Sequence, residues 1–215
     1  MLELSDVTKT FTKGGMTRKV LNGVNAVFMP GDAVGILGRN GAGKSTLIRI
    51  MAGVEHPTTG RVRRQMSISW PMGYDGAVHN ALSGADNARF IARIYDRPVD
   101  WVESFVKEFS EIGDQFRQPV KTYSAGMRAR LIFALSMAVD FDCYLIDEVI
   151  AAGDARFAER CRQALLARRS RSALILVSHQ MDTVRSLCTH AAVLTEGRLK
   201  FHEDLDQAFT EYERL

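Results

Sequence analysis

A glycine-rich segment between an apolar run and a helical stretch constrains this sequence more than any other feature. Residues 33–38, AVGILG, form a continuous apolar run that suits a strand buried on both faces of a sheet. The segment GRNGAGKS at 38–45 fits the pattern G-x-x-x-x-G-K-[ST], and the helical stretch LIRIMAGV follows it. Glycines let backbone N–H groups wrap closely around phosphate oxygens, and the N-terminus of the following helix adds partial positive charge. This order therefore predicts a loop that binds nucleotide phosphates, with Lys44 on the β- and γ-phosphates and Ser45 on Mg²⁺. The expected binding residues are Gly38, Arg39, Asn40, Gly41, Ala42, Gly43, Lys44, Ser45 and Thr46.

Two acidic residues at the end of a second apolar run complete this chemistry. The segment CYLIDE at 143–148 predicts a buried strand that ends in Asp147 and Glu148. Asp147 is expected to hold Mg²⁺ through water, and Glu148 to orient the attacking water. Beside a phosphate loop, this interpretation is preferred to a strand that merely ends in solvated acids.

The remaining segments alternate between strands and helices. Short apolar or alternating runs bounded by turn residues predict strands, and apolar residues at helical spacing predict helices. Such alternation is typical of a doubly wound parallel sheet. The expected strands are 2–7, 20–31, 61–64, 67–70, 143–147, 173–178 and 191–195, and the expected helices are 99–109, 156–169, 180–188 and 204–215, with a mainly helical insert from 78 to 141.

Composition limits the class of protein. The chain has 215 residues, a net charge of +3 and three cysteines without a C-x-x-C spacing, so neither a disulfide framework nor a zinc site is indicated. The N-terminus has no apolar core of a secretory signal, and the longest apolar run, LIFALSMAV at 131–139, is too short to cross a bilayer. We therefore expect one cytoplasmic nucleotide-binding domain over residues 1–215.

The segment YSAGMR at 123–128 brings in a family resemblance. Together with its neighbours, the chain resembles the ATP-binding-cassette (ABC) ATPases, in which a serine-glycine signature opens a helix and binds the γ-phosphate of the nucleotide held by the other subunit. Ser124 and Gly126 match this signature, although the commoner sequence of the signature is Leu-Ser-Gly-Gly-Gln. Ser124 precedes Asp147 by 23 residues, as the family requires. Without this context, Ser124 would be an ordinary helix N-cap.

Other elements follow in the order of the same family. Asp154 resembles the aspartate that crosses the dimer interface, and His179 resembles the switch histidine that contacts the γ-phosphate. Phe11 matches the aromatic residue on which adenine stacks, with a place in the core as the alternative. The resemblance implies a P-loop NTPase fold of ABC type, with a mainly parallel sheet core, an antiparallel β edge and a helical subdomain.

One element of the family is missing. A glutamine normally lies between the sheet and the helical subdomain, but this chain has none between Gln65 and Gln115. Tyr74, Asp75 and His79 lie in the corresponding stretch, and the sequence does not choose among them.

Four segments of the chain are similar to the ATPase subunits that export capsular polysaccharide across the bacterial inner membrane: SWPMGY at 69–74, LSGADNARFIARIYD at 82–96, YSAGMRARL at 123–131 and DEVIAAGDARF at 147–157. The resemblance implies a homodimer that sandwiches two ATP molecules with Mg²⁺ at the cytoplasmic face of that membrane. It also implies a separate polytopic permease and further polysaccharide export machinery as partners. Nucleic acid is not expected, but a soluble ATPase acting on nucleic acid or the ribosome is the alternative, supported only by basic clusters around Arg63 and Arg169. A third reading, a regulator that binds ATP without hydrolysing it, conflicts with the intact Lys44, Asp147, Glu148 and His179.

Overall fold

The computed structural model describes residues 1–72, 74–147 and 154–215, with the side chain of residue 75 excepted. These residues divide into two compact units. The first unit contains Met1–Pro71, residues 141–147 and Leu165–Leu215. The second unit contains Met72–Asp140, apart from residue 73, and residues 154–164.

A five-stranded sheet forms the centre of the first unit. Its strand order is β5-β6-β3-β7-β8, in which the first four strands run parallel and β8 is antiparallel to β7. This sheet confirms the expected mainly parallel core, although its antiparallel edge strand is not among the strands expected from the sequence. The strands are β3 (Ala33–Leu37), β5 (Cys143–Asp147), β6 (Ala173–Val177), β7 (His190–Thr195) and β8 (Arg198–His202).

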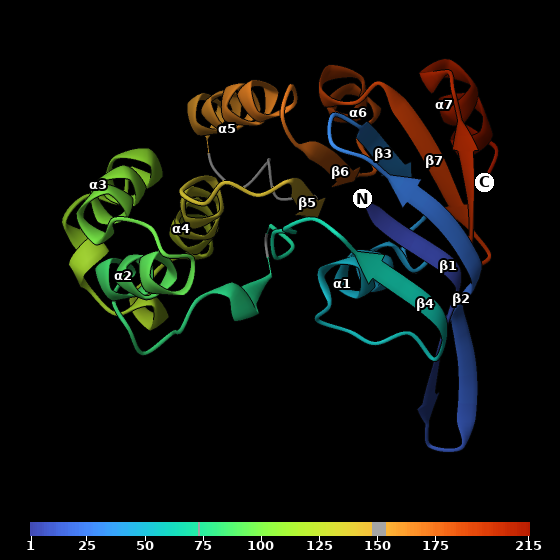
Figure 1. Cartoon of the computed structure of the whole chain (residues 1–215), viewed down its shortest axis with the longest axis horizontal. Helices are drawn as coiled ribbons and strands as arrows, with labels where there is room; N and C mark the ends of the chain where they lie inside the picture. Colours follow the sequence, from blue (N-terminus) through green and yellow to red (C-terminus); the bar gives the residue numbers. More distant parts are fainter. Residues whose placement is uncertain (73, 148–153) are drawn as a thin grey trace. The chain divides into compact units, whose positions relative to one another are not determined.

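Helices cover both faces of this sheet (Figure 1). All five residues of β3 are buried, as its continuous apolar run predicts. Ile36 packs in a core cluster with helix α1 (Lys44–Ala52), whereas an added Cβ on Gly35 would lie 2.4 Å from Val184 of helix α6 (Met181–Leu187). Because successive residues of a strand point to opposite faces, α1 and α6 cover opposite faces of the sheet. Helix α7 (Leu205–Glu213) contacts β7 and β8.

A smaller antiparallel sheet in the same unit has the order β2-β1-β4. Its strands are β1 (Leu2–Lys13), β2 (Met16–Phe28) and β4 (Thr59–Arg64), and the hairpin of β1 and β2 projects beyond the sheet (Figure 1). Gly14 and Gly15 form the turn with φ of 58° and 80°, a conformation that favours glycine. Arg64 at the end of β4 donates hydrogen bonds to the carbonyls of Ile50 and Met51. The small sheet is thereby tied to the C-terminal end of α1.

The prediction of a strand at 67–70 is wrong. This segment forms only one isolated bridge to the five-stranded sheet, between Ile68 and Cys143. Ser69 Oγ accepts a hydrogen bond from Leu145 N at 2.9 Å, and Ser67 Oγ accepts one from Asp142 N at 2.9 Å. Serine hydroxyls therefore satisfy backbone groups of the neighbouring segment that a continued strand would pair.

The second unit is helical. Its elements are α2 (Gly84–Ile94), α3 (Val99–Ser110), α4 (Ala125–Met137), residues 155–164 of α5 (Ala155–Arg168) and the 3₁₀ turns Asp75–Ala77, Gly113–Arg117 and Val120–Thr122. Val102, Val106 and Phe109 are buried along α3, in agreement with the helical spacing of that segment. The Phe109 ring lies 5.8 Å from that of Phe133 and 6.0 Å from that of Phe157, so aromatic packing joins α3, α4 and α5 in this unit.

All three cysteines are buried and free of disulfides: Cys143 and Cys188 lie in the first unit, and Cys161 lies in the second. Burial raises the pKa of each thiol to about 12. In the described part of the chain, no helix combines the length and the apolar character needed to traverse a lipid bilayer.

Candidate functional site

The register of the parallel sheet brings three predicted site segments to one edge. Asp147 ends β5 and pairs with Val177, the last residue of β6, and Val177 pairs with Ile36 of β3. The glycine-rich loop begins two residues after Ile36, and His179 lies two residues after Val177. In open parallel sheets, ligands bind at this carboxyl edge. The strands therefore gather Asp147, His179 and the loop where a ligand is expected.

Two glycines of the loop are needed by the fold itself. An added Cβ on Gly38 would lie 2.6 Å from the carbonyl oxygen of Leu194, a backbone atom that has no room to move. Gly43 has φ of 108°, and an added Cβ there would lie 2.9 Å from Val20 Cγ1. Helix α1 begins at the next residue, Lys44. The loop therefore packs closely against β7 and β2, and it leads directly into the N-terminus of α1, where the helix dipole favours an anion.

The loop borders a hollow of about 300 Å³, the lower end of the size range of ligand sites. The Lys44 side chain is 7% exposed, and its ammonium group donates to the carbonyl oxygens of Gly38 at 2.6 Å and Arg39 at 3.2 Å. A cation thus faces the loop, with the carboxylate of Asp147 on the same hollow. Residues from β2, the loop, α1 and β5 line it, namely Arg18, Val20, Asn40, Gly41, Gly43, Lys44, Ser45, Thr46 and Asp147.

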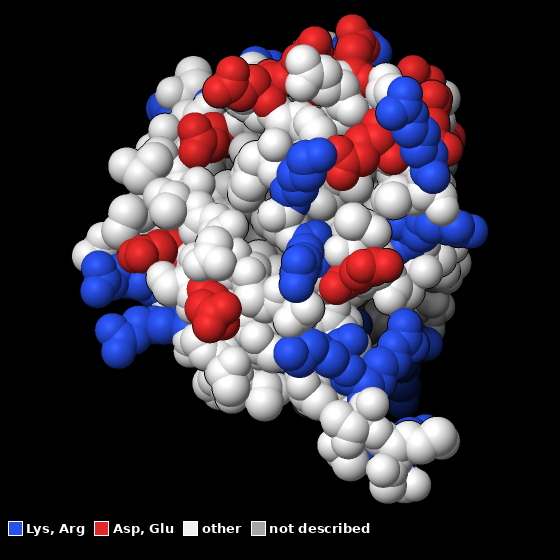
Figure 2. All heavy atoms as spheres, turned by 90° about the vertical axis from the view of Figure 1, so that its right-hand side faces the viewer, with Lys and Arg blue, Asp and Glu red and all other residues white. Residues whose placement is uncertain are grey.

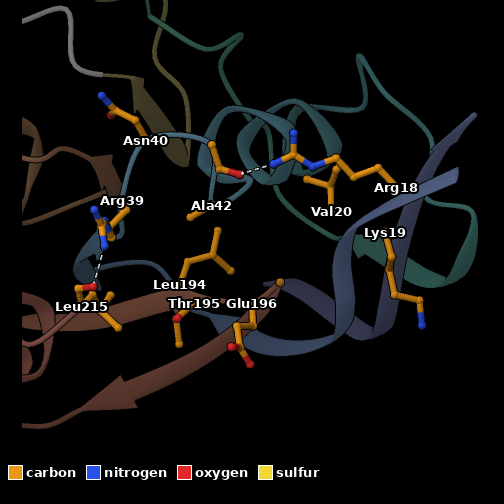
Figure 3. Close-up of a pocket in the computed structure, with 12 residues that line it drawn as sticks. Arg18, Lys19, Val20, Arg39, Asn40, Ala42, Leu194, Thr195, Glu196 and Leu215 are labelled. Carbon is orange, nitrogen blue, oxygen red and sulfur yellow. Dashed lines mark hydrogen bonds between the residues drawn. The ribbon is translucent and has the colours of Figure 1, made fainter. Parts of the chain in front are cut away.

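A second hollow, of about 600 Å³, adjoins the first along residues 40–41 of the loop. Figure 3 shows its lining, in which Ala42 and Leu194 lie between two arginines. Arg39 turns away from the phosphate side of the loop and donates to the carbonyl oxygen of Leu215 at 2.6 Å (Figure 3). Arg18 reaches from β2 and donates to the carbonyl oxygen of Gly41 at 3.2 Å (Figure 3). The Arg39 side chain is therefore not grouped with Lys44, Ser45 and Asp147.

Phe11 lies on the outer part of the β1–β2 hairpin. Its side chain is 42% exposed, so the residue is not part of the core. The ammonium group of Lys9 lies 4.9 Å from the centre of its ring. The exposed part of the ring is accessible to a planar ligand, although Phe11 does not line the 300 Å³ hollow.

The signature-like residues lie in the second unit. Ser124 is the N-cap of α4, and its Oγ accepts a hydrogen bond from Met127 N at 3.2 Å. Gly126 follows in the first turn, and among the described atoms outside its own helix backbone the nearest to an added Cβ there would be Ser124 Oγ at 4.0 Å. The fold of this unit therefore explains the serine but not the glycine.

Asp154 caps the following helix of the second unit. Its Oδ1 accepts from Phe157 N at 2.9 Å, and its Oδ2 accepts from Arg130 at 3.0 Å. The backbone hydrogen bond from Phe157, and then Arg130, lower the pKa of this carboxyl group. The charged form therefore supports the helix above the ordinary pKa of aspartate, and this support is lost as the pH falls through the lowered pKa.

Some predicted positions fall elsewhere. Glu148 lies outside the described residues, as do residues 149–153. Two of the residues in the stretch of the missing glutamine can be placed. Tyr74 precedes a 3₁₀ turn. The backbone N–H of His79 donates a hydrogen bond to Asn87 Oδ1 at 2.7 Å. Asn87 and Arg18 are the structurally important residues that the sequence did not suggest. The one signal in the sequence is that Arg18 and Val20 are two residues apart, so their side chains lie on the same face of β2.

Comparison with known proteins identifies the family. The family model described as ABC transporter matches residues 21–151. The chain belongs to the ABC transporter family. The ATP-binding subunits of this family are ATPases, so the chain is an ATPase subunit.

Relatives match along the whole chain. It is 51% identical to the ATP-binding protein BexA of Haemophilus influenzae, over 99% of this chain and 98% of that protein. It is 50% identical to the capsule polysaccharide export ATP-binding protein CtrD of Neisseria meningitidis serogroup B, over 100% of both chains. It is 40% identical to the polysialic acid transport ATP-binding protein KpsT of Escherichia coli, over 100% of this chain and 99% of that protein.

Solved structures show the same fold. A dimeric ATP-binding cassette bound to ADP and phosphate matches with a TM-score of 0.79 at 20% identity, over 93% of this chain and 96% of that one. An ATP-binding subunit of an ABC transporter matches with a TM-score of 0.80 at 18% identity, over 99% of both chains. The ABC ATPase fold expected from the sequence is confirmed.

Proposed function

We propose that this chain powers the export of a capsular polysaccharide across the bacterial inner membrane by hydrolysing ATP. One observation carries the proposal: the chain is 50% identical, over its full length, to a protein named for capsule polysaccharide export. A second relative, at 40% identity, is named for the transport of polysialic acid, which is also a polysaccharide. The intact phosphate loop supplies the chemistry that such an exporter requires.

Mg²⁺ fits the oxygen ligands beside the loop. Ser45 and Asp147 both line the 300 Å³ hollow, and a hydroxyl and a carboxylate are ligands that this hard cation prefers. Bound with the nucleotide, Mg²⁺ would neutralise charge on the phosphates. Lys44 holds the β- and γ-phosphates, and His179 at the same sheet edge contacts the γ-phosphate. These assignments agree with the register of β5, β6 and β3.

The complete site requires a second copy of the chain. Ser124 and Gly126 open a helix whose N-terminal N–H groups suit a phosphate, and the nearest described atom beyond the helix backbone would lie 4.0 Å from an added Cβ on Gly126. In the proposed homodimer, these residues bind the γ-phosphate held by the other subunit, and Asp154 lies at the dimer interface. A structural neighbour described as dimeric supports this arrangement.

Glu148→Gln tests the proposed catalytic base. A glutamine cannot accept the proton of the attacking water, but it leaves the phosphate loop unchanged. We expect the variant to bind ATP and dimerise while its turnover falls at least a hundredfold. Phosphate release and size-exclusion chromatography with ATP measure the two properties. Near-normal turnover would remove Glu148 from this role.

The proposed partners are a polytopic permease and the remaining polysaccharide export machinery, with the ATPase at the cytoplasmic face of the membrane. A tagged chain should be recovered from detergent-solubilised membranes of its own cell, with a polytopic membrane protein in stoichiometric amount and with ATPase activity. Replacing the chromosomal copy by Lys44→Ala should remove the polysaccharide from the cell surface, whereas Lys19→Gln should leave it in place. Normal surface polysaccharide in the Lys44 variant would overturn the proposal.

The nucleic-acid alternative has little support in the described residues. Arg64 is used inside the first unit, where it donates to carbonyls of α1, and Arg63 lies 3.7 Å from Glu3. Figure 2 shows basic and acidic side chains interspersed over much of one face, with acidic ones gathered towards its top. Recovery of the tagged chain only with ribosomal proteins or nucleic acid would reverse this preference.

A further inference from the structure

Arg18 lies directly opposite the residue proposed to stack on adenine. In the register of β1 and β2, Arg18 is paired with Phe11. Directly opposite residues of antiparallel strands project from the same face of the ribbon. The two side chains therefore leave the hairpin on one side, and the hydrogen bond from Arg18 to Gly41 shows that this side faces the phosphate loop.

The guanidinium group also borders the hollow that holds the phosphate-binding residues. Arg18 lines both the 300 Å³ hollow and the adjoining 600 Å³ one. Among the described residues that line the smaller hollow, Arg18 and Lys44 are the two basic ones, and they come from different elements. Figure 2 shows that basic side chains gather near the base of the projecting hairpin, so the local charge favours an anion there.

The order of groups in ATP then fixes what lies beside Arg18. If Phe11 holds the base and Lys44 the terminal phosphates, the ribose and the α-phosphate must pass between them. We propose that Arg18 binds the α-phosphate of the nucleotide, a proposal that rests on the nucleotide site described above. The guanidinium exchanges a neutral carbonyl acceptor, Gly41 O, for a charged one, which forms the stronger hydrogen bond.

The neighbouring residue provides a matched control. Lys19 carries the same charge as Arg18 but alternates to the other side of β2. Its ammonium group donates to Asn22 Oδ1 at 3.1 Å, and Figure 3 shows its side chain pointing away from that of Arg18. Lys19 lines the 600 Å³ hollow but not the 300 Å³ one, so Lys19→Gln removes one positive charge from the same hairpin without removing a group from the hollow that Lys44 borders.

The experiment compares the affinities of AMP, ADP and ATP for the full chain, measured by calorimetry in EDTA so that hydrolysis does not proceed. In Arg18→Gln, we expect Kd to rise about tenfold, by the same factor for all three nucleotides, because each has an α-phosphate. Arg18→Lys keeps the charge and should recover most of the affinity. Lys19→Gln should change each Kd by less than about twofold, since exposed charges act weakly at a distance in salt.

Three outcomes would overturn the proposal. An unchanged Kd in Arg18→Gln would show that Arg18 does not contact the nucleotide. A loss that grows from AMP to ATP would show that the hydrogen bond to Gly41 shapes the loop for the terminal phosphates instead. An equal loss in Lys19→Gln would show that only the overall charge of the hairpin matters. If the wild-type chain bound no nucleotide at all, the proposed function itself would fail.

Discussion

Among the described residues, and apart from its own helix backbone, Gly126 has no close neighbour that requires it to be glycine. An added Cβ would lie 4.0 Å from the nearest atom, and the backbone there is helical. Glycine in a helix costs stability relative to alanine. A residue that the fold does not require and that weakens its helix is explained if something outside this subunit approaches it closely.

Gly126→Ala should therefore separate stability from activity. We expect the free energy of unfolding to stay equal or rise by up to about 1 kcal/mol, because alanine favours the helix. ATP turnover should fall at least tenfold, because the new methyl group lies where the nucleotide of the other subunit approaches. Urea unfolding and phosphate release measure the two effects.

Ser124→Ala is the comparison for this variant. It removes the N-cap hydrogen bond to Met127 N, so it should lower both the free energy of unfolding, by about 1 kcal/mol, and the turnover. Full activity in Gly126→Ala would show that the open space around the residue has no role in the reaction.

At the scale of residues, the sequence predicted groups that lie together along the chain. The loop residues from Gly38 to Thr46 are contiguous, so their shared role is visible in one motif. The role of Arg18 depends on its register opposite Phe11 and on a contact with Gly41, 23 positions away. The direction of Arg39, towards Leu215, likewise depends on tertiary structure.

At the scale of elements, Asn87 fixes the entry to α2. The side chain is 2% exposed and accepts from His79 N at 2.7 Å. Its Nδ2 donates to the carbonyl oxygens of Ser83 at 2.8 Å and His79 at 3.2 Å. One buried amide thus satisfies three backbone groups of the segment that leads into the helix.

Asn87→Ala should lower the free energy of unfolding by about 3 kcal/mol, because it removes three side-chain hydrogen bonds and leaves the His79 N–H without its side-chain acceptor. Urea unfolding followed by circular dichroism measures the change. Asn80→Ala is the control, because Asn80 is exposed and its backbone carbonyl, which accepts from Lys121 N, is kept. A loss below about 1 kcal/mol in Asn87→Ala would show that water replaces the amide.

The strands that the sequence predicted best are those buried along their whole length. β3 and β6 are buried at every position, so a continuous apolar run identifies them without a partner. β8, in contrast, has exposed and half-exposed residues and was not expected, since it depends on pairing with β7. The segment 67–70 has the alternation of a strand, but its serine hydroxyls form hydrogen bonds that replace further pairing.

At the scale of the whole molecule, the predicted site residues are shared between the two units. Lys44, Asp147 and His179 belong to the first unit, whereas Ser124, Gly126 and Asp154 belong to the second. Each unit also has its own buried thiol, Cys143 in the first and Cys161 in the second. The thiols can therefore report on the unfolding of each unit.

We expect none of the three thiols to react quickly with a thiol reagent at pH 8 in the native protein. Burial raises the pKa of each to about 12, so almost no thiolate is present, and the side chains are covered. In strong denaturant all three should react. A time course of labelling followed by mass spectrometry measures this, and rapid modification of Cys161 in native protein would show that its unit opens readily.

The burial of these three sulfurs has a practical consequence. The three native cysteines do not compete for a maleimide dye at neutral pH, so they need not be replaced before fluorescence labelling. Met16 is 79% exposed at the tip of the hairpin, and Phe90 is 54% exposed on α2. Met16→Cys and Phe90→Cys would place one fluorophore on each unit, and energy transfer between the two would follow their separation through each cycle of ATP hydrolysis.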